Sequence, residues 1–156
     1  LASAQKSIGS FPYDGFNLAL IDGQQAFVVE AGEELRLAVL NRGIHVIANG
    51  DLNDSHDSRL ARVRGFSETL RDSPWQNWSA EFRPMLGEHA TEAAPPVCLH
   101  HGDRGTVSAS VIALAADVHR SEYWYAPGPP CTTAFENFSP LLRDTLSTDP
   151  AQEQES

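Results

Sequence analysis

The chain of 156 residues has the length of one domain, and a chain of this size buries about two thirds of its unfolded surface. Its 21 Asp and Glu residues outnumber its 11 Lys and Arg residues, which argues against a nucleic-acid backbone or an anionic membrane surface as the main partner. No apolar run approaches the ~20 residues of a membrane span, so we predict a cytoplasmic protein and leave its oligomeric state open.

The first part of the chain is rich in predicted strands. Residues 16–22 and 25–32 are apolar runs separated by the short turn signal Gly23-Gln24, a pattern that predicts a hairpin. A third run covers residues 35–41, and a fourth covers residues 44–49. Four short strands in succession predict an antiparallel meander.

After Asn49 the apolar period becomes helical. Leu60, Val63, Phe66 and Leu70 recur at helical spacing and predict a helix from Ser58, with Asp57 or Ser58 as its N-cap and the arginines at 59, 62 and 64 on its wet side. Residues 74–86 predict a second, short helix that is interrupted at Pro84.

The last third returns to extended structure. Residues 97–100 and 106–114 read as strands, and residues 121–128 form a partner strand joined to them through a polar turn at 117–120. The prolines of the PGPPC run, residues 127–131, should end this sheet. The tail at 147–156 is polar and is expected to be disordered. We therefore predict one α+β domain over residues 1–146.

One candidate site is the polar run NGDLNDSHD, which spans residues 49–57. Asp51, Asn53, Asp54 and His56 are oxygen and imidazole ligands of the kind that divalent metals use. GDLND also resembles the metal loop of the endonuclease/exonuclease/phosphatase superfamily. That superfamily needs a Ser-Asp-His run near its C-terminus, which this chain lacks. We therefore favour turn and helix-capping roles for these residues.

A second candidate is the segment HHGDRGTVSASV, which spans residues 100–111. Arg104 precedes a strand whose polar face carries Thr106 and Ser108, and an arginine there could hold a carboxylate or phosphate in a bidentate fork. The alternative is a hairpin corner with solvent-facing hydroxyls. The adjacent His100 and His101 should point to opposite faces of a strand, which argues against a shared metal.

The two cysteines are the remaining candidates. Cys98 and Cys131 are too few and too far apart for a CxxC motif or a disulfide framework. Cys131 also lacks an identifiable base that would make it a nucleophile. We expect two ordinary thiols, no bound metal and no cofactor.

Four blocks in order, over residues 13–142, carry a family resemblance: YDGFNLALIDG, RGIHVIANGDLNDSHDSRLARVRGF, RGTVSASVIAL and YAPGPPC. Together they resemble the later part of the NRDE family. The resemblance implies an N-terminal-nucleophile (Ntn) hydrolase-like αββα sandwich of two antiparallel sheets. By similarity, Asn49 falls at an oxyanion-hole position and Arg104 near an active-site arginine.

The resemblance also implies where the nucleophile lies. Family members carry a Cys directly after the initiator Met, whereas this chain opens on Leu1. We expect the chain to be the C-terminal portion of a longer protein, with the fold incomplete at its N-terminus and the nucleophile outside it.

The predicted function is amide (C–N) bond hydrolysis of the Ntn type. Asn49 and Arg104 are the predicted catalytic residues, Thr106 and Ser108 the predicted substrate-binding residues, and the predicted partner is a small molecule. The alternative is a noncatalytic protein of the same fold that binds or traffics a small ligand of the lipid or haem type. A metal-dependent phosphodiesterase is the less favoured third possibility.

Overall fold

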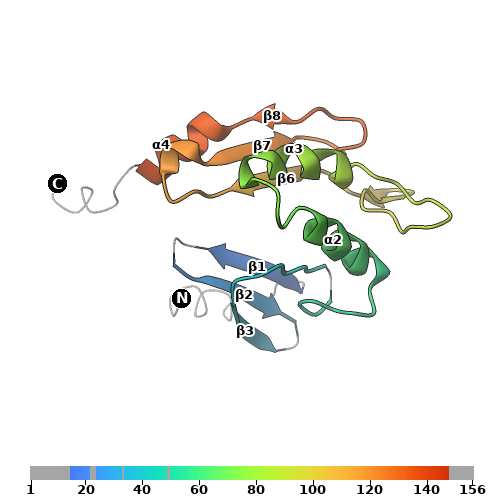
Figure 1. The fold of residues 1–156 in the computed structure, drawn as a ribbon. Helices are drawn as coiled ribbons and strands as arrows, with labels where there is room; N and C mark the ends of the chain where they lie inside the picture. Colours follow the sequence, from blue (N-terminus) through green and yellow to red (C-terminus); the bar gives the residue numbers. More distant parts are fainter. Residues whose placement is uncertain (1–14, 22–23, 33, 49, 148–156) are drawn as a thin grey trace. The chain divides into compact units, whose positions relative to one another are not determined.

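The computed structural model describes residues 15–21, 24–32, 34–48 and 50–147 (Figure 1). The chain divides into two compact units, residues 1–68 and 69–156, and each is described by itself. The described residues form three antiparallel sheets and three α-helices, which confirms the α+β class. The single domain over residues 1–146 stays a prediction, and the tail at 148–156 lies outside the described residues.

Unit 1 contains a three-stranded meander. It consists of β1 (Phe16–Ile21), β2 (Ala26–Ala31) and β3 (Leu35–Leu40), paired antiparallel in that order. The register places Val29 opposite Leu18 on one side and Leu37 on the other. The central strand holds Val28 and Val29, both almost completely buried. Apolar runs with a tight connection thus predicted these strands correctly.

The fourth predicted strand, residues 44–49, is wrong. Residues 44–47 lie in no strand or helix, because this segment finds its hydrogen bonds in the following loop. The Val46 N–H donates to Asn53 Oδ1 at 2.9 Å, and the Asn53 N–H donates to the Val46 carbonyl at 2.8 Å. Asn53 adopts a φ of 60°, a conformation that asparagine tolerates better than most residues. A side-chain amide therefore replaces the expected neighbouring strand.

The helix α2 (Ser58–Thr69) begins where the sequence predicted. Asp57 caps it, since its Oδ1 accepts the N–H of Arg59 at 2.8 Å and of Leu60 at 3.4 Å. The prediction that Arg64 lies on the solvent-facing side of this helix is wrong. Arg64 donates to Asn53 Oδ1 at 2.6 Å and to the Ile44 carbonyl at 3.3 Å. The helix is thereby tied to the preceding loop.

Unit 2 begins at Thr69, and its described residues form two α-helices, a 3₁₀ turn and two small sheets. Its elements in chain order are α3 (Trp75–Leu86), β4 (His100–His101), β5 (Arg104–Gly105), β6 (Ala109–Ala113), η1 (Val118–Arg120), β7 (Glu122–Ala126), β8 (Glu136–Asn137) and α4 (Ser139–Ser147).

Several features of unit 2 differ from the prediction. The strands predicted at residues 97–100 and 106–114 are limited to His100–His101 and Ala109–Ala113. The helix α3 continues through Pro84, which lies in its last turn, where only Met85 and Leu86 follow it. The PGPPC run does not end the sheet, because the chain returns as β8 and pairs with β7. The helix α4 was not predicted. Its short SPLLRDTLS pattern holds too few apolar positions to reveal a helical period.

The main sheet of unit 2 has the strand order β6-β7-β8, with α3 packed against β6 and α4 against β7. Polar side chains join these layers. The Ser79 hydroxyl of α3 donates to Glu122 Oε2 of β7 at 2.6 Å, and the Ser139 hydroxyl of α4 accepts the Tyr123 N–H at 3.0 Å. No helix in the described part of the chain is long and apolar enough to cross a membrane.

Candidate metal centre

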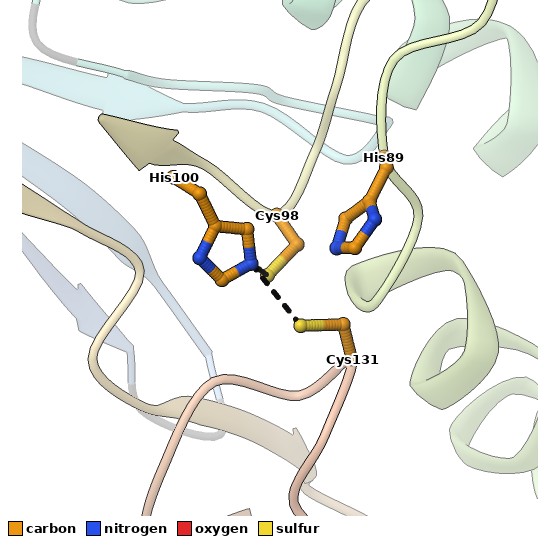
Figure 2. A group of neighbouring side chains, drawn as sticks. All are labelled: His89, Cys98, His100 and Cys131. Carbon is orange, nitrogen blue, oxygen red and sulfur yellow. Dashed lines mark hydrogen bonds between the residues drawn. The ribbon is translucent and has the colours of Figure 1, made fainter. Parts of the chain in front are cut away.

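Four potential metal ligands converge in unit 2: His89, Cys98, His100 and Cys131. One ligand atom from each lies within 4.8 Å of every other. Figure 2 shows the two imidazole rings and the two thiols pointing toward a common centre. Cys98 is 1 % exposed, Cys131 is half-buried, and both histidines are exposed. The cluster thus lies at the edge of the core, with its sulfurs more deeply buried than its rings.

The first ligand, His89, follows the end of α3. Its neighbour Glu88 uses its carbonyl to accept the N–H groups of both Val97 and Cys98, each at 2.9 Å. These bonds hold the segment after the helix beside the segment that carries the second ligand. Residues 89 and 98 are therefore brought together by backbone geometry and need no metal to meet.

Cys98 and His100 lie two residues apart, Cys98 in a bend and His100 at the start of β4. The hairpin of β4 and β5 fixes this segment, since His100 pairs with Gly105 and the Thr106 N–H donates to the Leu99 carbonyl at 2.9 Å.

Cys131 comes from a tight turn between β7 and β8. The N–H groups of Thr132 and Thr133 both donate to the Pro129 carbonyl, at 3.0 and 2.9 Å. The end of α3 packs directly on this turn. A Cβ added at Gly87 would stand 3.3 Å from the Cys131 Cα, so the close approach favours glycine there.

The distances fit a tetrahedral ion. His100 Nε2 lies 3.2 Å from Cys131 Sγ and 3.6 Å from Cys98 Sγ. Zn–S and Zn–N bonds of about 2.3 and 2.0 Å at tetrahedral angles separate an N and an S ligand by about 3.5 Å and two S ligands by about 3.8 Å. The rings of His89 and His100 stand perpendicular, with their centroids 5.1 Å apart.

The environment of Cys98 shows opposing electrostatic effects. Burial is the largest and raises the pKa of the Cys98 thiol, and the contact with the Cys131 thiol raises it further. The Cys131 backbone N–H and the Thr106 hydroxyl hydrogen-bond the same sulfur and lower its pKa. A metal ion would reverse the balance, because a coordinated thiol loses its proton.

The predicted site residues are distributed differently. Arg104 is exposed on β5, and Ser108 is exposed just before β6. Thr106 lies beside the cluster, where its Oγ1 accepts the Leu99 N–H at 3.0 Å. Asn49 lies outside the described residues, so its predicted role stays a prediction.

The GDLND loop of unit 1, residues 50–54, is held by hydrogen bonds to the β1–β3 meander. The Asn17 side chain donates to the Ala48 carbonyl at 2.6 Å, and Glu30 Oε1 accepts the Leu52 N–H at 2.7 Å, so the loop is fastened to the meander. Asp51 Oδ1 lies 3.5 Å from Arg36 Nη1. The adjoining groove measures about 430 Å³. Asp57 of this run caps α2, and Asp54 Oδ1 accepts the His56 N–H at 2.8 Å.

The cluster was not predicted from the sequence, because the cysteines were considered only with each other and the histidines only with each other. Cys98 was compared with Cys131, which is distant in sequence, and His100 with His101, which faces the opposite side. The signal present in the sequence is the Cys-x-His spacing of residues 98 and 100, which puts a thiol and an imidazole on one side of a strand. The contributions of His89 and Cys131 depend on tertiary structure alone.

No protein-family model, no curated protein and no solved structure matches this chain. The residues of the cluster therefore carry the functional argument.

Proposed function

We propose that unit 2 is a zinc-binding module, in which His89, Cys98, His100 and Cys131 hold one Zn²⁺. The observation that carries this proposal is the convergence of four ligand atoms within 4.8 Å from three separate segments. Backbone hydrogen bonds and the packing of Gly87 bring these segments together, and their four ligand side chains point toward one centre. A set of two thiolates and two imidazoles is a ligand combination that zinc prefers.

The proposed role of the zinc is structural. Four protein ligands fill a tetrahedral shell, whereas catalytic zinc sites keep one position open for water or substrate. The ion would join the segment after α3, the segment that leads into β4 and the turn before β8. It would thus fasten three segments whose ordering otherwise depends on a few backbone hydrogen bonds.

The test is metal content and metal-dependent stability of the full chain. Protein purified without chelators should contain one zinc per chain by elemental analysis. Removing the zinc should lower the midpoint of unfolding followed by tryptophan fluorescence. All three tryptophans, Trp75, Trp78 and Trp124, lie in unit 2, so this signal reports on the unit that holds the site.

The neighbouring histidines provide a matched pair of variants. His100→Ala and Cys131→Ser should each lose zinc, because each removes a ligand. His101→Ala changes the adjacent exposed residue on β4 and should keep full zinc content. Equal zinc content in His100→Ala and His101→Ala, or a wild-type protein that binds no zinc at micromolar concentrations, would overturn the proposal.

The hydrolase predicted from the NRDE resemblance and its αββα sandwich stay predictions. What supports them is the order of four sequence blocks, while the described residues include neither Asn49 nor a nucleophile for that reaction. Arg104 is exposed on a two-residue strand. The small-ligand and phosphodiesterase alternatives likewise stay predictions, and zinc binding is the function that the geometry favours.

A further inference from the structure

The two sulfurs of the candidate zinc site are close enough to bond to each other. Cys98 Sγ and Cys131 Sγ lie within 4.8 Å, and both cysteines are free thiols in the structure. Tetrahedral coordination would hold the sulfurs about 3.8 Å apart, and a disulfide needs about 2.05 Å between them. The sequence contains two cysteines, so a disulfide within the chain can form only between this pair. Zinc binding and a disulfide are therefore alternative states of the same two residues.

The two sulfurs differ in their access to solvent. Cys98 is 1 % exposed, whereas Cys131 is half-buried on the turn before β8. His100 Nε2 lies 3.2 Å from Cys131 Sγ, and His100 is exposed, so the immediate neighbour of this sulfur also borders solvent (Figure 2). A small molecule that enters from solvent thus reaches Cys131 before Cys98.

We propose that the zinc site is a peroxide-responsive switch, in which oxidation joins Cys98 to Cys131 and expels the zinc. This inference rests on the proposed zinc binding. Zinc holds cysteine as the thiolate, and the thiolate is also the form that peroxides oxidise. The geometry thus supplies an accessible sulfur for the first attack and a second sulfur beside it.

The chemistry takes two steps. An electron pair of the Cys131 thiolate attacks one oxygen of hydrogen peroxide, so an S–O bond forms, the O–O bond breaks, and hydroxide leaves a sulfenic acid behind. The Cys98 thiolate then attacks the Cys131 sulfur, the S–S bond forms, and the S–O bond breaks with release of a second hydroxide. The two sulfurs together lose two electrons and the peroxide gains them. Two protons from solvent convert the hydroxides to water.

The disulfide removes half of the ligand set. A sulfur in a disulfide no longer carries the thiolate charge that binds the metal. His89 and His100 would remain as two neutral ligands, whereas a structural zinc site needs four. Zinc therefore leaves as Zn²⁺, while the link between residues 98 and 131 persists as a covalent bond.

The experiment uses the full chain loaded with zinc, whose metal content is measured first. Hydrogen peroxide is added in the presence of a chromophoric zinc indicator, and intact mass and peptide mapping follow the cysteines. A parallel sample contains dimedone, which traps sulfenic acids. Met85→Leu is the matched control, because Met85 is the one methionine of the sequence, lies buried outside the ligand set, and has the other side chain that peroxide oxidises at sulfur.

We expect the zinc to be released in step with the loss of two hydrogens from the monomer. Dithiothreitol should restore both thiols and zinc binding. Dimedone should label Cys131 in preference to Cys98, and Met85→Leu should release zinc as the wild type does.

Four results would count against the switch while leaving the zinc site in place. These are zinc that stays bound in peroxide, zinc lost with sulfinic acids or a disulfide between two chains, dimedone found on Cys98 alone, and release that disappears in Met85→Leu. A protein that holds no zinc before peroxide is added would instead refute the proposed function, and the switch with it.

Discussion

Gly105 offers the sharpest test of how the hairpin of β4 and β5 supports the zinc site. A Cβ placed on Gly105 would stand 2.5 Å from the Leu99 carbonyl oxygen, below the 3.0 Å that real Cβ contacts reach. The obstacle is backbone, so no side chain can rotate out of the way. Gly105→Ala should therefore push the Leu99 carbonyl back by about half an ångström.

That displacement has a calculable cost. The Thr106 N–H donates to the same Leu99 oxygen at 2.9 Å, and a retreat of this size lengthens the bond beyond the usual 3.2 Å limit. A lost hydrogen bond costs about 0.5–1.5 kcal/mol, and overpacking in general costs about 1–3 kcal/mol. We expect Gly105→Ala to lower the free energy of unfolding of unit 2 by about 1–3 kcal/mol. Because Cys98 and His100 flank Leu99, we also expect a loss of zinc affinity of about tenfold, equivalent to about 1.4 kcal/mol.

The assay is urea unfolding followed by tryptophan fluorescence, with zinc and with chelator, together with a zinc competition titration. Gly65→Ala in α2 is the control, since a Cβ there meets nothing within 4 Å and Gly65 belongs to unit 1. Its helix should become more stable by about 1 kcal/mol, with no change in the tryptophan signal of unit 2. A Gly105→Ala protein with unchanged stability and zinc affinity would refute the claim that the hairpin positions the ligands.

Three further predictions concern other parts of the chain. The Ser79 hydroxyl, followed by the Trp124 N–H, holds the pKa of Glu122 below its ordinary 4.5, so Glu122 stabilises the fold above that pH and loses this contribution as pH falls through the lowered value. Between pH 7 and pH 4, the free energy of unfolding measured with urea should fall less in Glu122→Gln than in the wild type. An equal fall in both proteins would contradict the reasoning. Asp57→Ala should reduce helical circular dichroism and hydrogen-exchange protection at the start of α2, whereas unchanged protection there would exclude a capping role. In metal-free protein, hydrogen peroxide should take one hydrogen from each of Cys98 and Cys131, forming a disulfide and water. Mass spectrometry should show the loss of two hydrogens, with zinc slowing the reaction, and separate sulfinic acids would indicate that the sulfurs do not meet.

Local pattern was enough to predict much of the fold. The alternation and turn signals of residues 16–40 gave β1 to β3, and the spacing of Leu60, Val63 and Phe66 with Asp57 before them gave α2. The prediction failed where a side chain replaced a strand, as Asn53 does for Val46. It also failed at β8, whose two residues are ordered by pairing with Trp124 and Tyr125 and carry no pattern of their own.

The candidate site was harder to predict for a physical reason. Only the Cys98–His100 pair follows from a local rule, the period of two in extended chain. His89 joins them through the Glu88 carbonyl, and Cys131 joins through the close packing of Gly87 on its turn. Both contacts are tertiary, and neither leaves a spacing that could be read in one sequence. Thr106 was singled out for its hydroxyl, and the structure places that oxygen on the N–H of Leu99, the residue between Cys98 and His100.

The composition of unit 2 explains why such a site would matter for stability. Its buried apolar side chains are few and include Leu70, Met85 and Ala126, while the serines at 79, 121 and 139 occupy buried positions as well. The described part of unit 2, residues 69–147, is close to the size below which a core seldom contributes more than about 3–5 kcal/mol. A cross-link that joins residues 98 and 131 removes loop entropy worth about 3–4 kcal/mol from the unfolded chain. The two contributions are of the same size, so a zinc ion at this position would stabilise unit 2 about as much as its apolar core does.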